Sequence, residues 1–105
     1  MPVIKEENKI NQQKLLQGIK SWKQKARDKY KIDLIALFGS WAKDEAKPDS
    51  DIDILINFLP EASLFDWVNL AQDMEDEFHH RVDLVPQSNL KQNLKSYIEN
   101  DLIPL

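Results

Sequence analysis

The 105-residue sequence contains no cysteine. This absence excludes disulfide-stabilised scaffolds, zinc sites built from thiolates, and cysteine nucleophiles. Any metal ion must therefore be held by oxygen atoms or imidazole rings. Glycine is also scarce, since Gly39 is one of only two in the chain.

Long apolar stretches are absent as well. The longest are Leu34 to Phe38 and Ile54 to Ile56, far shorter than the roughly 20 residues that a membrane-spanning helix needs. The first ten residues include a polar run from Lys5 to Lys9 and lack the apolar core of a secretory signal. We therefore expect a cytoplasmic protein that does not enter a membrane. With 42% hydrophobic and 30% charged residues, the composition is that of a globular chain, and its length predicts a single domain over residues 1–105.

Charge is distributed unevenly along the chain. Residues 1–31 hold nine Lys or Arg and three Asp or Glu, a net charge of +6. The remaining residues carry a net charge of −10, which gives the chain its overall −4. This acidic balance argues against direct nucleic-acid binding over a broad basic surface and favours cation binding. Four basic residues do recur at helical spacing: Lys20, Lys23, Arg27 and Lys31. We interpret them mainly as a solvated helix face, with docking of an acidic partner or of nucleotide phosphates as the alternative.

Hydrophobic periodicity predicts the elements of an α/β domain. A period of three to four residues predicts a helix from about Asn8 to Tyr30, with one buried face. The apolar run Asp33 to Phe38 predicts a strand buried on both faces, which ends at Gly39-Ser40. A short helical turn over Trp41 to Ala46 would follow, and Asp51 to Phe58 alternates as a strand does. The helix face comprises Leu15, Ile19, Trp22, Ala26 and Tyr30.

The second half of the chain continues the alternation. Ser63 and Asp66 form a capping-box pattern before a predicted helix, whose buried stripe we expect to be Leu64, Trp67, Ala71, Met74 and Phe78. Arg81 to Val85 is a third predicted strand, closed by Pro86. Ser88 would open a last helix, before the apolar tail from Asp101 to Leu105. The predicted order is α-β-(α)-β-α-β-α, around a mixed sheet of three or more strands packed by helices.

Two acids and a glycine turn form the main candidate site. Strand alternation places Asp51 and Asp53 on one face, where they can hold divalent cations. Hard oxygen ligands favour Mg²⁺ bridged to nucleotide phosphates. Gly39-Ser40 lies at a strand-to-helix turn, where glycine permits close backbone approach and free N–H groups can bind phosphate. Asp83, an acid flanked by apolar residues on another strand, is the candidate third carboxylate.

Simpler interpretations of these residues fit the sequence less well. Asp49, Asp51 and Asp53 resemble the start of a calcium loop, but Ile54 and Pro60 stand where an EF-hand requires glycine and glutamate. The pair His79-His80 does not suit metal binding, because adjacent helical residues do not face one site. Ser40 has no histidine partner near it in sequence, so contact between its hydroxyl and phosphate is favoured over a nucleophilic role.

The sequence resembles the minimal nucleotidyltransferases of the DNA polymerase beta superfamily. The shared pattern is Gly39-Ser40, a spacer, and Ser50-Asp51-Ile52-Asp53, with the Asp83 strand supplying a third acid. It is most similar to the stand-alone MNT antitoxins that are encoded beside a helical HEPN ribonuclease toxin. The resemblance implies a nucleotidyltransferase fold, with Asp51, Asp53 and Asp83 as catalytic and metal-binding residues.

The resemblance also implies an activity. Members of this family transfer AMP from ATP to a tyrosine of the HEPN toxin and silence it, and we expect two Mg²⁺ ions to assist. Gly39, Ser40, Lys43 and Ser50 would contact the nucleotide. Many members read Gly-Ser-Arg-Ala-Arg-Gly, so Lys43 would offer phosphate a point charge in place of a guanidinium fork, and Trp41 is expected to pack more readily than to stack on a base. Two alternatives stay open: a nucleotidyltransferase for small molecules such as aminoglycosides, and a non-catalytic module that masks its partner.

Overall fold

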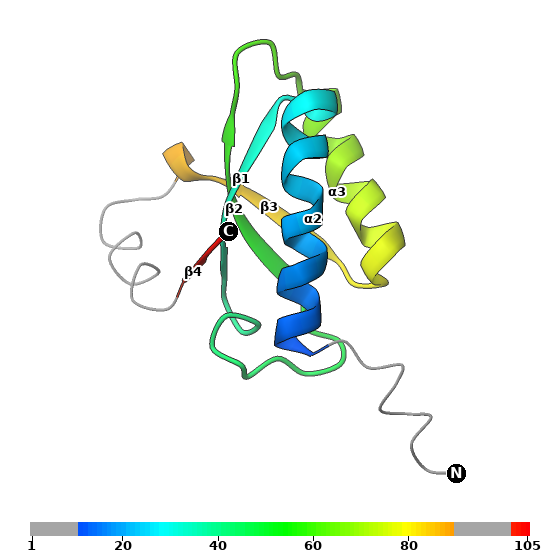
Figure 1. Cartoon of the computed structure of the whole chain (residues 1–105), viewed down its shortest axis with the longest axis vertical. Coiled ribbons are helices and arrows are strands. Elements are labelled where there is room, and N and C mark those ends of the chain that lie inside the picture. Colours follow the sequence, from blue (N-terminus) through cyan, green and yellow to red (C-terminus); the bar gives the residue numbers. More distant parts are fainter. Residues whose placement is uncertain (1–10, 90–101) are drawn as a thin grey trace.

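A computed structural model describes residues 11–89 and 102–105. Two helices, α2 (Gln12–Tyr30) and α3 (Leu64–Phe78), pack beside a sheet of β1 (Ile32–Phe38), β2 (Ile52–Phe58), β3 (Val82–Pro86) and β4 (Ile103–Pro104). A short 3₁₀ turn, η1 (Gln87–Asn89), follows β3. Both helices lie on the same side of the sheet (Figure 1). The fold is thus a mixed α/β layer structure, as the sequence predicts.

Helix α2 begins and ends with well-defined caps. The Asn11 side chain accepts a hydrogen bond from the Lys14 amide at 2.8 Å, which satisfies one free donor of the first turn. Lys31 ends the helix in the left-handed conformation, at φ 58°. The five residues of the predicted buried face are all buried. The predicted start near Asn8 is wrong, because Asn11 is extended and caps the helix, which begins at Gln12.

The sheet has the order β3-β2-β1-β4. β1 runs antiparallel to both β2 and β4, whereas β2 and β3 are parallel. Ile52, Ile54 and Ile56 are fully buried, so this face of β2 packs on the core beneath the helices, and the acids of the strand belong to the opposite face. The alternation predicted for the second strand is therefore correct.

Strand β1 contains a β-bulge that the sequence did not predict. Leu34 pairs with Ile56, and the next paired residue, Ala36, lies opposite Leu55, so Ile35 is the extra residue. A bulge shifts the alternation of a strand by one residue. Leu37 consequently pairs with Ile54 on the helix side, and Phe38 pairs with Asp53 on the other face.

Helix α3 starts with the predicted capping box. The Ser63 side chain accepts from the Asp66 amide, and the Asp66 side chain accepts from the Ser63 amide. Leu70, Met74 and Phe78 form the buried stripe. The prediction was wrong for Leu64, which is exposed, because the helix meets the sheet along the line of Leu70 and Met74 and its first turn projects beyond that contact.

The apolar tail is part of the sheet. Ile103 pairs with Leu37 and Pro104 with Ala36, while the Leu105 amide donates to the Ile35 carbonyl at 2.9 Å. The apolar character of the tail therefore serves the fold, because its backbone pairs with β1 and Ile103 and Leu105 pack against the core. The helix predicted from Ser88 falls largely outside the described residues.

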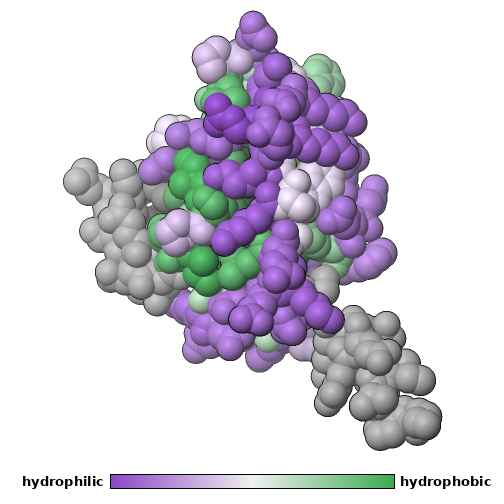
Figure 2. All heavy atoms as spheres, viewed as in Figure 1, coloured by the Kyte–Doolittle hydropathy of each residue, from purple (hydrophilic) through white to green (hydrophobic). Residues whose placement is uncertain are grey.

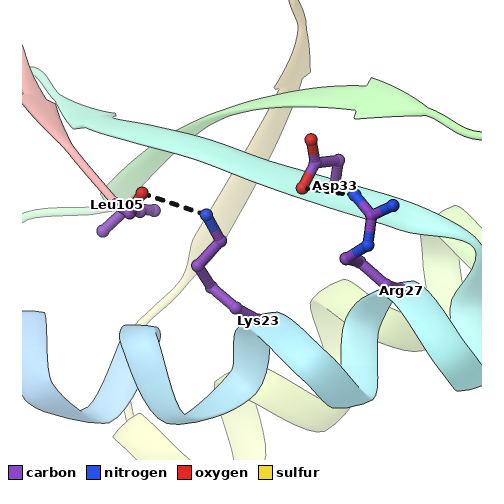
Figure 3. Close-up of polar contacts among 4 residues, drawn as sticks. All are labelled: Lys23, Arg27, Asp33 and Leu105. Atoms are coloured by element: carbon purple, nitrogen blue, oxygen red, sulfur yellow. Dashed lines mark hydrogen bonds and ion pairs between the residues drawn. The ribbon is translucent and has the colours of Figure 1, made fainter.

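Two of the four basic residues at helical spacing, Lys23 and Arg27, connect α2 to the sheet. The Lys23 ammonium donates to the main-chain oxygen of Leu105 at 3.0 Å, and Arg27 forms an ion pair with Asp33 at 3.1 Å (Figure 3). The set of four is therefore only partly a solvated face. No helix in residues 11–89 or 102–105 combines the length and apolar character required to cross a membrane.

Candidate active site

Strand pairing brings two of the candidate acids together. Asp53 in β2 is the direct register partner of Asp83 in β3. Paired residues of neighbouring strands point to the same face, and the residues beside Asp83, Val82 and Leu84, are buried. Both carboxylates therefore lie on the face of the sheet opposite the helices.

The glycine turn lies directly beside Asp53. Phe38, the last residue of β1, pairs with Asp53, and Gly39 follows with φ +77°, a conformation that side-chain-bearing residues rarely adopt. A Cβ atom at Gly39 would overlap Oδ2 of Asp53 and lie 3.2 Å from its Cγ. Gly39 is thus required both for the turn and for the close approach of the backbone to this carboxylate.

The electrostatic environment of Asp53 reflects this crowding. Burial, followed by the charges of Asp83 and Asp51, raises the pKa of the Asp53 carboxyl from its ordinary 3.8 to about 6. An apolar environment and neighbouring like charges both disfavour the ionised form. Such a group is stabilised by a cation more than an isolated surface acid would be.

Asp51 completes the acidic cluster from the loop before β2. It is exposed, and its charge contributes to the raised pKa of Asp53. Within the described residues, no three His, Asp or Glu side chains are gathered tightly enough to form a ready-made metal site. The donor set nevertheless fits Mg²⁺, because it consists of carboxylate oxygens around a partly buried acid whose ionised form is short of compensating charge.

The residues after Gly39 form consecutive turns in place of the predicted short helix. The Ala42 and Lys43 amides donate to the Gly39 carbonyl at 3.1 and 3.2 Å, and Asp44 adopts the left-handed conformation at φ 59°. The left-handed residue ends the turn before a helix develops. The amides of Ser40 and Trp41 take no part in these turn bonds, and they lie at the start of the turn beside Asp53.

A side chain from α2 fixes this turn. The Gln12 amide group donates to the carbonyl oxygens of Trp41 at 2.9 Å and Ala42 at 3.1 Å. Trp41 is buried in the core, as predicted, and its indole N–H donates to the Ser50 carbonyl at 3.3 Å. The turn is thereby joined to the segment that leads into Asp51.

Ser50 and Lys43 are the other two residues that the sequence predicts to contact the nucleotide. The Ser50 hydroxyl accepts a hydrogen bond from the Lys47 amide at 2.8 Å, so it has a structural role in the loop before Asp51. Lys43 is exposed on the turn that follows Gly39. His79 caps α3, and His80 packs its ring edge-on against Trp41 at 5.5 Å between centroids.

Two residues of α3, Trp67 and Glu75, position the strand of Asp83, a role that the sequence pattern does not predict. The Glu75 carboxylate accepts from the Val82 amide at 2.9 Å, and the Trp67 indole donates to the Leu84 carbonyl at 2.9 Å. These bonds cover the outer edge of β3, which would otherwise be an unpaired sheet edge. The hydrophobic period predicts that Trp67 is buried, but it carries no information about hydrogen bonds from Trp67 or Glu75 to β3.

Comparison with known proteins places this arrangement in a family. Residues 20–104 match the family described as Polymerase beta, Nucleotidyltransferase. The chain belongs to this nucleotidyltransferase family. Among its relatives is a Thermococcus cleftensis protein named Protein adenylyltransferase MntA, which is 35% identical over 81 residues, covering 77% of this chain and 82% of the relative. A Methanocaldococcus jannaschii protein, MJ1217, named as a candidate protein adenylyltransferase, is 40% identical over 78 residues, or 73% of this chain and 80% of that protein.

Solved structures support the same fold. A protein described as a minimal nucleotidyltransferase superposes with a TM-score of 0.76 at 26% identity, covering 93% of this nucleotidyltransferase chain and 99% of that chain. A complex of a tri-AMPylated Shewanella oneidensis HEPN toxin with an MNT antitoxin matches with a TM-score of 0.63 at 24% identity, covering 89% of this chain and 70% of that chain. The second likeness is one of fold.

Proposed function

We propose that this nucleotidyltransferase transfers AMP from ATP to a tyrosine hydroxyl of a HEPN-type ribonuclease toxin and so acts as its antitoxin. Two relatives, at 35% and 40% identity, are named for protein adenylyltransferase activity. The observation that carries the chemistry is the register pairing of Asp53 with Asp83 beside Gly39. The tyrosine acceptor and the toxin partner follow from the resemblance of the sequence to MNT antitoxins.

In this proposal Asp51 and Asp53 hold Mg²⁺ ions and the first residues of the Gly39 turn bind the triphosphate. Bound Mg²⁺ would supply neutralisation of phosphate charge and a lower pKa for the attacking hydroxyl. The backbone amides of Ser40 and Trp41 would donate to phosphate oxygens from the start of this turn, and Lys43 would add a positive charge.

The transfer step uses the acid on β3. The acceptor oxygen forms a bond to the α-phosphorus of ATP while the bond from that phosphorus to the bridging oxygen breaks, and pyrophosphate leaves. The proton of the acceptor hydroxyl passes to the Asp83 carboxylate. Catalysis would come mainly from positioning and charge stabilisation, as in other phosphoryl and nucleotidyl transfers.

The test is AMP transfer from ATP labelled at the α-phosphate, with a HEPN-type protein as acceptor. Replacing both Asp51 and Asp53 by Asn should reduce transfer by a factor of about 10³ or more, since metal charge stabilisation contributes several kcal/mol. Asp49→Asn, an exposed acid of the same loop, is the matched control and should retain activity. Unchanged transfer by the double variant would refute the proposed metal role.

The acceptor is tested separately by a panel of small hydroxyl compounds, aminoglycosides included. Labelling of a small compound with no labelling of the protein would replace the protein acceptor by a small-molecule acceptor. Silencing of the toxin by the double Asn variant would instead favour masking without catalysis.

A further inference from the structure

The candidate catalytic groups reach the site from separate segments of the chain. Asp53 lies in β2 and Asp83 in β3, whereas Asp51 belongs to the loop before β2 and Gly39 to the turn after β1. Strand pairing fixes Asp53 opposite Asp83, but Gly39 and Asp51 lie outside the paired residues. Groups that act together in catalysis must be held within about 0.5 Å of their productive geometry. Contacts between side chains must therefore supply the positioning that the sheet does not.

Trp41 reaches three of these segments from its place two residues after Gly39. Its indole N–H donates to the carbonyl oxygen of Ser50, at the end of the loop before β2, at 3.3 Å. Its ring meets the ring of His80 edge-on, with 5.5 Å between centroids, and His80 leads directly into β3. One side chain thus joins the turn after β1, the loop before β2 and the approach to β3.

Both partners of Trp41 are themselves held in place. The Ser50 amide donates to the Lys47 carbonyl at 2.9 Å, and its hydroxyl accepts from the Lys47 amide at 2.8 Å. The His80 ring donates through Nδ1 to the Phe78 carbonyl at 2.8 Å, because a carbonyl oxygen can only accept. The indole is therefore bound to fixed points and not to freely moving side chains.

Helix α2 holds the same residue at its main chain. The Gln12 amide group donates to the carbonyl oxygen of Trp41 at 2.9 Å and to that of Ala42 at 3.1 Å. Figure 1 shows the loop between β1 and β2 beside the first turn of this helix. Trp41 is thereby restrained at its backbone by α2 and at its side chain by the segments on either side of the acids.

Core packing alone does not account for an indole at this position. Trp41 belongs to the hydrophobic core, and a phenyl ring would also bury apolar surface there. The indole N–H, however, joins positions nine residues apart across a loop whose residues are mostly exposed. Exposed loops are mobile unless such bonds restrain them, so this bond fixes the end of the loop from which Asp51 projects.

We propose that Trp41, held at its carbonyl by Gln12, is a positioning residue of the active site. It sets the Gly39 turn, the loop before Asp51 and the start of β3 relative to one another. Its effect on catalysis rests on the proposed nucleotidyl transfer, whereas its effect on the geometry of these segments does not. A displacement of about 1 Å in such an arrangement can reduce a rate about 100-fold.

The test compares two buried tryptophans. Trp41→Phe keeps an aromatic ring in the core and removes the N–H donor. Trp22→Phe is the matched control, because Trp22 is 6% exposed against 7% for Trp41 and its indole donates to the Glu77 carboxylate at 3.0 Å. The outward side of α2 is largely hydrophilic (Figure 2), and Trp22 lies on the buried side of this helix, across the sheet from the acids. A purely structural role predicts the same result for both variants.

Two measurements report on the site without turnover. Native-state amide hydrogen exchange detects local opening, and Trp41→Phe should accelerate exchange in residues 40–51 more than in β1. Titration with Mn²⁺ alone, followed by electron paramagnetic resonance, measures binding at the acids. Trp41→Phe should bind Mn²⁺ about tenfold more weakly, as changes behind metal ligands do, and AMP transfer should fall at least as far. Trp22→Phe should lose stability in urea but keep the wild-type Mn²⁺ affinity, rate of transfer and exchange pattern.

A second pair of variants tests the main-chain restraint and does not depend on the folding of Trp41→Phe. Gln12→Met removes both donors to the turn, and Gln13→Met, at the exposed neighbouring position, is its control. Because the turn is proposed to bind the triphosphate, Gln12→Met should raise the KM for ATP more than it lowers kcat. It should also accelerate exchange of the Ser40 amide, and Gln13→Met should do neither.

The proposal and the proposed function fail in different ways. Wild-type Mn²⁺ affinity and transfer in Trp41→Phe, with stability lowered as in Trp22→Phe, would make Trp41 a core residue only. Exchange of residues 40–51 that is unchanged in both Trp41→Phe and Gln12→Met would also overturn the positioning role. Absence of Mn²⁺ binding by the wild type would instead contradict the proposed metal role of the acids, and the exchange measurements would then decide the role of Trp41 by themselves.

Discussion

Replacing Asp53 by Asn should stabilise the metal-free protein. Burial and the charges of Asp83 and Asp51 raise the pKa of Asp53 from 3.8 to about 6, so its ionised form is disfavoured in the folded state. A shift of this size corresponds to about 3 kcal/mol, which solvent screening of a partly exposed site reduces to about 1 to 2 kcal/mol. Asn removes the charge at nearly the same size.

The pH dependence has a defined sign. Because the folded-state pKa lies above the unfolded value, the native protein binds more protons between about pH 4 and 6. The wild type should therefore gain stability from this site as the pH falls from 7 towards 4. The Asn variant lacks the titrating group, so its gain in unfolding free energy over the wild type should be full at pH 7 and small at pH 4.

Urea unfolding in EDTA, followed by tryptophan fluorescence at pH 7 and pH 4, measures both effects. Asp49→Asn, in the exposed turn before the strand, controls for general loss of negative charge. Addition of Mg²⁺ at pH 7 should reverse the order, because it stabilises the wild type more than the Asn variant. An Asn variant less stable than the wild type at pH 7 without metal, or an advantage that does not change with pH, would refute the electrostatic account of the site.

Three further substitutions test other parts of the structure. Gly39→Ala should cost about 1 to 3 kcal/mol of stability through positive-φ strain and abolish AMP transfer, because its methyl group overlaps the Asp53 carboxylate. In the control Gly18→Ala the added Cβ would meet the Phe78 ring, so this variant should change stability but not AMP transfer. Loss of transfer in both variants would contradict the specific role of Gly39. Tyr30→Phe removes the hydrogen bond to Asp73 and should cost about 2 kcal/mol below pH 10. Since burial and Asp73 raise the pKa of Tyr30 from 10.0 to about 12, the wild type should lose that advantage between these pH values in urea titrations, and a constant difference would be inconsistent with it.

Much of the fold could be predicted because its main elements have strong periodic patterns. The buried face of α2 and the alternation in β2 both follow from one-sided burial, which leaves a repeat in the sequence. The Ser63–Asp66 capping box is likewise a local pattern, and it marks the start of α3 correctly. The same alternation correctly predicts that Asp53 faces away from the buried Ile52 and Ile54, whereas Asp51 precedes the strand.

The remaining features depend on contacts between distant residues. β4 comprises only two residues, too few to show a repeat, and its pairing with β1 joins positions more than 60 residues apart. Leu64 fits the helical period but lies beyond the area that the sheet covers. Gln12 shows no pattern of its own, yet its hydrogen bonds to the turn after Gly39 span about 30 residues of sequence.

The bulge at Ile35 connects the packing of the sheet to its chemistry. Strict alternation from Leu34 would place Ala36 and Phe38 on the helix side. The extra residue reverses this phase, so Leu37 fills the core and Phe38 shares the face of Asp53. The chain therefore leaves β1 beside the acids, where Gly39 turns with φ +77°. Deleting Ile35 should restore strict alternation, move the Gly39 turn out of register with Asp53, and abolish AMP transfer. Substituting Ile35→Val preserves the bulge and should leave transfer intact, so a deletion variant that folds and still transfers AMP would show that the bulge does not set the position of the turn.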